Sequence, residues 1–171
     1  PIKVGGNFYC GKNKLKNLEG APKEVGGGFD CSENRLTSLE GAPMEVGGYF
    51  DCVENELVTL KGCPHKVGGY FQCYNNKLTS LPELNDSLRY LRCFNNQLTS
   101  LPKLNPFLQN IICSNNKLKS DKSNYYVEVK PECDFDGDCG NCYGCLKGSV
   151  TYPIKGPIYN NIRDHIYIDN S

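Results

Sequence analysis

A pattern of apolar residues repeats every 20 or 21 positions along the first 120 residues of the chain. Each unit holds an aromatic or aliphatic residue, a cysteine two positions later, an asparagine three positions after the cysteine, and a leucine two positions beyond the asparagine. The cysteines are Cys10, Cys31, Cys52, Cys73, Cys93 and Cys113, and the asparagines are Asn13, Asn34, Asn55, Asn76, Asn96 and Asn116. Six copies of one pattern predict a repeat array that stacks unit upon unit.

The residues around each cysteine predict one short strand per unit, with neighbouring strands about 4.8 Å apart in a parallel sheet. Because side chains alternate along a strand, the aromatic or aliphatic residue and the cysteine both point into the core. The asparagines then form a ladder whose side-chain amides bond to backbone groups where each strand ends. We interpret the six cysteines as core residues, since a buried free cysteine behaves as a small hydrophobe. Cys63, which takes an alanine or leucine position of the other units, is expected to be buried too.

The array is predicted to be mainly β, with little or no helix and with its parallel sheet on the concave face. The first four units carry Val-Gly-Gly, at 4–6, 25–27, 46–48 and 67–69, and the last two units are one residue shorter there. Because glycine adopts positive φ with little strain, we expect a small bulge or tight bend at these pairs. Prolines on the convex side favour extended or 3₁₀ segments. We assign the solenoid to residues 1–121.

The units from Leu78 to Leu118, with L-T-S-L-P-x-L-N, resemble the short bacterial class of leucine-rich repeats found in secreted effector proteins. The V-G-G-x-F-x-C and L-E-G-A-P units look like tandem repeats in proteins of phages and large DNA viruses. The resemblance covers about residues 4–120. It implies a solenoid that binds other proteins through its sheet face, without naming a partner. Nothing in the chain resembles the catalytic domain of effector ubiquitin ligases.

Side chains between the core positions of each strand are expected to form columns on the concave surface. Aromatic residues gather in the middle units, with Asp30 and Asp51 to one side and Arg92 to the other. Tyrosine and arginine are favoured at interface hot spots, although tyrosine also simply suits strands. The predicted binding residues are Tyr49, Asp51, Tyr70, Gln72, Tyr74, Tyr90, Arg92 and Phe94.

The repeat pattern stops near Leu118, and residues 122–171 are interpreted as a Cys-rich segment that caps the C-terminal end of the solenoid. Four cysteines in this segment, Cys133, Cys139, Cys142 and Cys145, lie close enough in sequence to hold a tetrahedral zinc ion. Two disulfides in an oxidising setting, or free thiols, remain open alternatives. A structural zinc ion is therefore the single cofactor that the sequence suggests.

Composition narrows the classes of function. Lys+Arg and Asp+Glu both number 19, so the formal net charge is zero, which argues against nucleic acid or an anionic membrane as a partner. No apolar run is long enough to span a bilayer, and no signal peptide is visible. His65 and His165 stand alone, and no nucleotide-binding glycine motif occurs, so we predict no enzymatic activity.

The leading hypothesis is a non-enzymatic protein-binding or assembly module, in a viral or phage structural or accessory protein. Unpaired ladder cysteines favour the reducing cytosol of the host or producing cell, with incorporation into a virion as an extension. The alternative is the recognition domain of a bacterial effector whose enzymatic domain lies elsewhere. A third hypothesis is a zinc-stapled adaptor. Because the repeats begin almost at Pro1, we expect a piece of a longer or processed chain, or a second subunit that caps this end.

Overall fold

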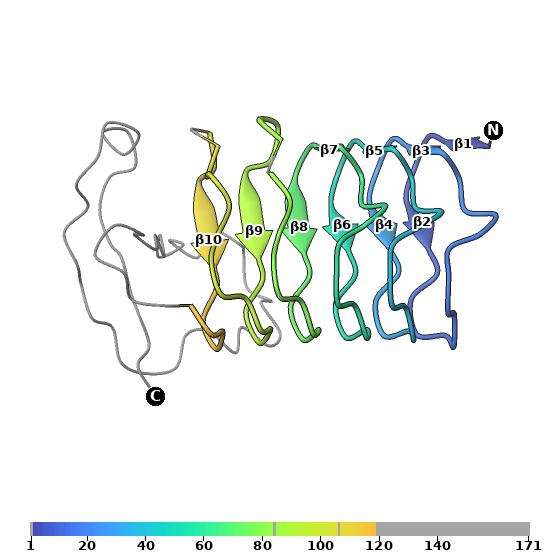
Figure 1. The fold of residues 1–171 in the computed structure, drawn as a ribbon. Coiled ribbons are helices and arrows are strands. Elements are labelled where there is room, and N and C mark those ends of the chain that lie inside the picture. The colour runs from blue at the N-terminus through green and yellow to red at the C-terminus, as the bar shows by residue number, and fades with distance from the viewer. Residues whose placement is uncertain (1, 84, 106, 119–171) are drawn as a thin grey trace, which may run out of the picture.

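The structure, a computed structural model, describes residues 2–83, 85–105 and 107–118, which form a row of stacked coils (Figure 1). Within these ranges the coils hold two parallel sheets and no helix. The six-stranded sheet, in the order β10-β9-β8-β6-β4-β2, contains Phe8–Tyr9 (β2), Phe29–Asp30 (β4), Phe50–Asp51 (β6), Tyr70–Gln72 (β8), Tyr90–Arg92 (β9) and Asn110–Ile112 (β10). The four-stranded sheet contains Lys3–Val4 (β1), Glu24–Val25 (β3), Glu45–Val46 (β5) and Lys66–Val67 (β7). The predicted β solenoid is thus confirmed.

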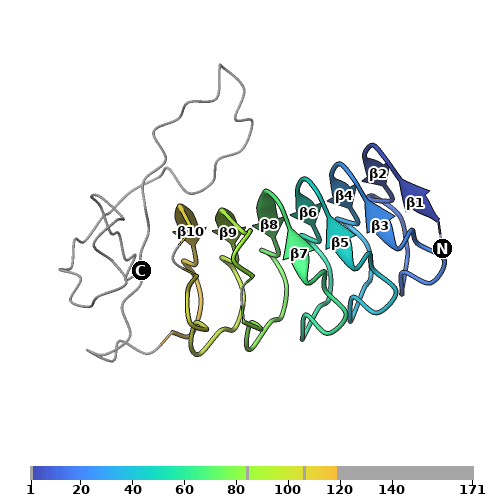
Figure 2. The same ribbon diagram turned by 90° about the horizontal axis from the view of Figure 1, so that it is seen from above.

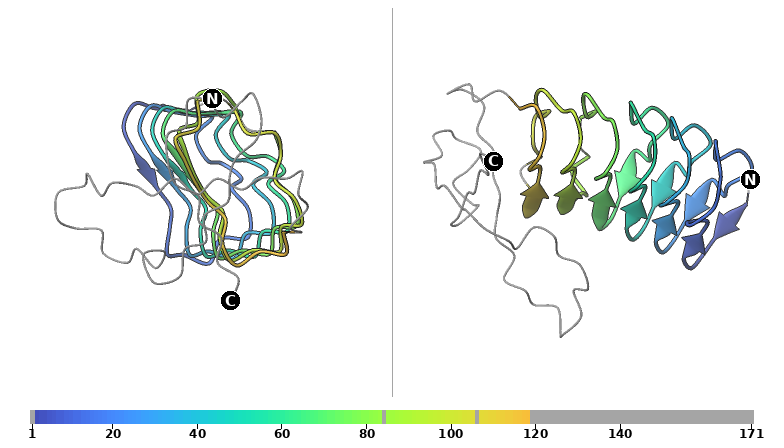
Figure 3. Two further views of the ribbon diagram at one scale, coloured as in Figure 1. Left: turned by 90° about the vertical axis from the view of Figure 1, so that its left-hand side faces the viewer. Right: turned by 90° about the horizontal axis from the view of Figure 1, so that it is seen from below.

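Equivalent positions of successive units pair in register, as Phe29 does with Phe50. In an end-on view the coils lie over one another around a shared interior (Figure 3). Phe29 and Cys31 have no exposed surface, as predicted for core positions. Phe8, Phe29, Phe50 and Phe71 stack in sequence, with ring centroids 5.3 to 5.5 Å apart. Each unit therefore buries its apolar side chains against the same side chains of its neighbours.

The predicted asparagine ladder is present. Asn55 Oδ1 accepts the backbone N–H of Leu36 in the preceding coil at 3.0 Å. Its Nδ2 donates toward the carbonyl oxygens of Cys31, Cys52 and Val53 at 3.1 to 3.2 Å. Asn55 is buried, so this amide satisfies backbone groups that water cannot reach.

The residue before each ladder asparagine adopts a left-handed conformation, which the sequence did not lead us to expect. The φ angles lie between 51° and 57° at Lys12, Glu33, Glu54, Asn75, Asn95 and Asn115. Lysine and glutamate rarely adopt this conformation, whereas asparagine accepts it more easily. The hydrogen bonds of the adjacent ladder asparagine hold the turn in place, so the backbone conformation follows from the ladder.

The second sheet corrects the interpretation of the Val-Gly-Gly pairs. Each valine ends a strand of the four-stranded sheet, and the glycines that follow carry the chain to the adjacent side of the coil (Figure 2). Their φ angles are not positive, so the predicted reason for glycine is wrong. A Cβ atom on Gly47 would lie 2.2 Å from the carbonyl oxygen of Gly26, and one on Gly68 would lie 2.2 Å from that of Gly47. Glycine is present because adjacent coils approach too closely for a side chain.

The convex segments contain β-turns in addition to extended chain. Gly20, Gly41 and Gly62 have φ between 83° and 93°, at the third position of a four-residue turn. In the first of these turns Ala21 N donates to the carbonyl oxygen of Leu18 at 3.1 Å. No 3₁₀ helix occurs in the described ranges, so the turns replace that part of the expectation. Cys63 is half-buried against the core, which is less than predicted.

Candidate functional site

The outward-facing side of the six-stranded sheet carries the residues predicted to bind a partner, and we call it the sheet face. Phe50 and Cys52 point inward and are fully buried, so Tyr49 and Asp51 lie on the outward side. The same alternation holds in the following strands, which face the viewer in Figure 1. All eight predicted residues share this face, namely Tyr49, Asp51, Tyr70, Gln72, Tyr74, Tyr90, Arg92 and Phe94.

The aromatic side chains of the sheet face form two stacks across β8 and β9. Tyr70 and Tyr90 have ring centroids 4.4 Å apart and an interplanar angle of 18°. Tyr74 and Phe94, which follow the same two strands, are 4.3 Å apart at 10°. Stacked rings on neighbouring strands restrict each other's rotamers, so these four side chains form a rigid apolar platform.

A row of hydrogen-bonded polar side chains runs between the two stacks. Gln72 Nε2 donates to Asp51 Oδ2 at 3.1 Å, and Arg92 Nη1 donates to Gln72 Oε1 at 3.3 Å. The Arg92 guanidinium carbon also lies 5.8 Å from the ring centroid of Tyr70, within the range of a cation–π contact. The polar row is therefore oriented before any partner arrives, with a carboxylate at one end and a guanidinium at the other.

Asp51 is the residue of the sheet face with the most perturbed carboxyl group. Burial raises the pKa of Asp51 to about 6, and the negative charges of Asp30 and Glu33 act in the same direction. The N–H of Val53, which donates to Asp51 Oδ1 at 3.0 Å, and the charge of Arg92 oppose this shift in pKa. The charge of the sheet face consequently changes in the mildly acidic range.

Two residues outside the predicted set contribute to this surface. Asp30 lies beside Asp51 in register, and its Oδ1 accepts the N–H and the O–H of Ser32 at 2.9 and 2.6 Å. The ring of Tyr49 lies over Gly28, because a Cβ atom there would fall 2.2 Å from Tyr49 Cε1. The repeat register of the sequence already placed both residues on this surface, since each is 21 positions before a predicted binding residue.

In the described part of the chain no group of three or more His, Cys, Asp or Glu side chains could hold a metal ion. Burial raises the pKa of the Cys52 and Cys73 thiols, which keeps them protonated and unreactive. No helix in the same ranges is long and apolar enough to cross a membrane.

Two predictions fall outside the described residues. They are the zinc site at Cys133, Cys139, Cys142 and Cys145, and the domain boundary at residues 121 and 122.

Comparison by sequence finds no matching protein-family model and no matching curated protein. Among solved structures, the chain is similar to the leucine-rich-repeat domain of a Shigella effector, with a TM-score of 0.59 and 27% identity. This match covers 66% of the present chain and 50% of the Shigella chain, so the present chain spans half the length of that structure. YopM from Yersinia enterocolitica WA-314 matches with a TM-score of 0.47 and 26% identity, over 66% of this chain and 29% of that chain.

The repeat pattern, the coil geometry and the likeness to the Shigella domain define the class of protein. The chain contains a leucine-rich-repeat solenoid of the short bacterial type, with units of 20 or 21 residues. This confirms the resemblance to bacterial repeats that the sequence indicated. Solenoids of this class present extended surfaces that generally serve in protein interaction.

Proposed function

We propose that this solenoid is the protein-recognition module of a bacterial effector-like protein, and that it binds its partner through the sheet face. The observation that carries the proposal is the pair of aromatic stacks, Tyr70 with Tyr90 and Tyr74 with Phe94, on either side of an oriented polar row. Stacked aromatic rings supply contact area at a small cost in side-chain entropy, which is the usual property of an interface hot spot.

The surroundings of the stacks also suit recognition. The sheet beneath them is held by in-register pairing and by the buried asparagine ladder, so the surface keeps its shape on binding. The polar row between the stacks supplies a carboxylate, an amide and a guanidinium that can read the partner's polar groups. An apolar centre with a polar row through it gives both affinity and orientation.

The same surface would serve the assembly role in a viral or phage structural or accessory protein. The Shigella structure described above is the repeat domain of a bacterial effector, so it favours the effector hypothesis and lends no support to the viral one. Under the effector hypothesis the solenoid is not itself enzymatic, and the module works in the cytosol of a host cell. An enzymatic domain elsewhere in the full protein is part of this proposal.

The test is quantitative affinity capture from a eukaryotic cell lysate, with the wild-type chain compared to a triple variant, Tyr70→Ala, Tyr90→Ala and Phe94→Ala. We expect the triple variant to lose at least about ten-fold in captured partner, as the removal of hot-spot side chains predicts. The matched control removes three exposed apolar side chains away from the stacks, Met44→Ala, Val58→Ala and Phe107→Ala. Circular dichroism would verify that both variants fold.

Capture that survives in the triple variant and disappears in the control would overturn the proposal, because the partner would then bind elsewhere on the solenoid. A wild-type chain that forms large regular assemblies and captures nothing would favour the viral or phage assembly role.

A further inference from the structure

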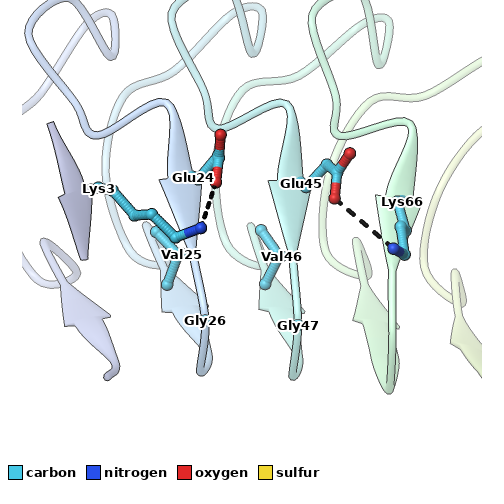
Figure 4. Close-up of a pocket in the computed structure, with 8 residues that line it drawn as sticks. All are labelled: Lys3, Glu24, Val25, Gly26, Glu45, Val46, Gly47 and Lys66. Atoms are coloured by element: carbon cyan, nitrogen blue, oxygen red, sulfur yellow. Dashed lines mark ion pairs between the residues drawn. The ribbon is translucent and has the colours of Figure 1, made fainter. Parts of the chain in front are cut away.

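Each of the two sheets carries a pair of carboxylates in register on adjacent strands, but the residues next to the two pairs differ. On the four-stranded sheet, Glu24 and Glu45 pair in register on adjacent strands. Lys3 Nζ lies 2.8 Å from Glu24 Oε2, and Lys66 Nζ lies 3.6 Å from Glu45 Oε2 (Figure 4). The hydrogen bond and charge of Lys3 lower the pKa of Glu24. Each carboxylate of this pair thus has a lysine on its outer side.

On the six-stranded sheet, Asp30 and Asp51 form the corresponding in-register pair. Their outer neighbours are Tyr9 and Gln72, which are neutral. None of the five ion pairs found within the described ranges includes either aspartate. Like charges on adjacent strands repel, and here the repulsion contributes to the raised pKa of Asp51.

Neutral groups make the hydrogen bonds that the two carboxylates accept. Ser32 donates to Asp30, and Val53 and Gln72 donate to Asp51. Arg92 donates to Gln72 Oε1 at 3.3 Å, and its charge acts on Asp51 from beyond ion-pair distance. Unlike the glutamate pair, the aspartate pair has no cation at ion-pair distance within the described ranges, although the charge of Arg92 acts on Asp51 from further away. Such a local conflict is typical of a functional site.

Tyr49 lies on the same face of the sheet as the aspartate pair. The Tyr49 ring lies over Gly28, on the side of the earlier units, whereas the Tyr70 ring stacks on Tyr90, on the side of the later units. The pKa of Tyr49 is raised mainly by burial and by a hydrogen bond with Tyr9, and further by the negative charges of Asp30 and Asp51. Carboxylates bordered by tyrosine are the environment that a guanidinium group favours.

We propose that the partner of the sheet face inserts an arginine side chain between Asp30 and Asp51, with its guanidinium bridging the two carboxylates beside Tyr49. The inference rests on the proposed function and names the chemistry that the partner carries. Arginine fits better than lysine, because two carboxylates on strands about 4.8 Å apart call for several N–H donors spread over a planar group.

The first test titrates the isotope-labelled chain with butylguanidine and follows backbone amide shifts by NMR at about pH 7.5, above the pKa of Asp51. We expect saturable shifts at residues 30–32 and 51–53, with a dissociation constant in about the millimolar range for so small a ligand. Butylurea, which has nearly the same shape and no charge, should give none, and butylamine should bind more weakly. The shifts should diminish at about pH 5, where Asp51 takes up a proton. The negative charges of Asp30 and Glu33 favour this protonation, and the positive charge of Arg92 opposes it.

Two variants make the test specific. Asp30→Asn with Asp51→Asn should abolish the butylguanidine shifts and lower partner capture by about ten-fold or more, as the loss of a buried charge pair predicts. Glu24→Gln with Glu45→Gln, the matched pair on the other sheet, should change neither measurement. Equal binding of butylurea or butylamine, or shifts that persist in the double asparagine variant, would overturn the arginine proposal. If that variant captures the partner normally while the aromatic triple variant does not, the proposed function stands and the arginine proposal fails.

Discussion

At the scale of single residues, the ladder asparagines show how the chemistry of one side chain selects the local structure. Asn55 accepts one backbone N–H and offers its amide hydrogens to three carbonyl oxygens. Aspartate has a similar shape and no donors, whereas leucine would leave all four groups unsatisfied. An asparagine at this position of each unit is therefore required by the turn that follows each strand.

Asp51 gives a prediction about stability and pH. Its pKa rises from 3.8 to about 6 on folding, so the folded chain holds the proton more tightly than the unfolded chain does. This contribution to stability is present below about pH 4 and is lost as the pH rises through about 6. We expect Asp51→Asn to be more stable than the wild type by about 1–2 kcal/mol above pH 6, and the difference to vanish near pH 4.

Urea unfolding at about pH 4.5 and pH 7.5 would measure this difference in the free energy of unfolding. Asp86→Asn, the same substitution at an exposed position, is the control and should change stability by less than about 0.5 kcal/mol at either pH. If Asp51→Asn changes the free energy of unfolding by the same amount at both pH values, burial of the ionised Asp51 carboxyl group does not weaken the folded state.

At the scale of elements, the Val-Gly-Gly segment decides whether a coil has one strand or two. The first four coils contribute a strand to each sheet, and the fifth and sixth contribute to the six-stranded sheet alone. In the fifth coil Ser87 Oγ donates to the carbonyl oxygen of Val67 at 3.0 Å, so a side chain bonds to the edge of β7. The one-residue difference between long and short units therefore sets the extent of the second sheet.

The glycines at this bend lead to a prediction with an internal control. Gly5 and Gly47 occupy the same repeat position, but a Cβ atom on Gly47 would lie 2.2 Å from a backbone oxygen, whereas one on Gly5 would meet nothing within 4 Å. Gly47→Ala should destabilise the chain by about 1–3 kcal/mol, the usual cost of forcing extra atoms into a packed site. Gly5→Ala should be close to neutral. Thermal unfolding of both variants would decide, and equal effects would refute the close-approach argument.

At the scale of the whole molecule, each coil packs on its neighbours alone, so the solenoid presents long surfaces around a narrow core. Cys31, Cys52, Cys73 and Cys93 lie in that core with no exposed surface, and burial raises the pKa of their thiols. Alkylation of these thiols therefore requires the coils to open.

Labelling of the native chain with iodoacetamide, followed by peptide mass spectrometry, tests this consequence. The half-buried Cys63 should react faster than the buried Cys52 by about a hundred-fold or more, which corresponds to about 3 kcal/mol of opening free energy. In denaturant the two thiols should react at similar rates. Similar rates for Cys52 and Cys63 in the native chain would contradict this expectation. They would mean that the coil around Cys52 opens locally while the rest of the solenoid stays folded.

Much of this structure could be predicted from the sequence because the repeat is strict. Once equivalent residues are known to pair in register, Phe29 of one unit must lie beside Phe50 of the next. The alternation of side chains along each strand then decides which of them face outward. The core, the asparagine ladder and the columns of the sheet face follow directly. The binding role of those columns stays a prediction, as does the zinc site at Cys133, Cys139, Cys142 and Cys145.

Other features depend on distances between coils, which no pattern along the chain contains. The strands of the second sheet are two residues long, so they show no alternation that a reader of the sequence could detect. The reason for Gly47 became visible only when the backbone of the preceding coil lay next to it. Likewise, the sequence places carboxylates in register on both sheets. Only the folded chain decides that Lys3 and Lys66 reach one pair, and that no cation of the described residues comes within ion-pair distance of the other. The repeat period alone determined which residues are neighbours, and the tertiary structure decided which of those neighbours touch, because contact depends on the reach and direction of each side chain.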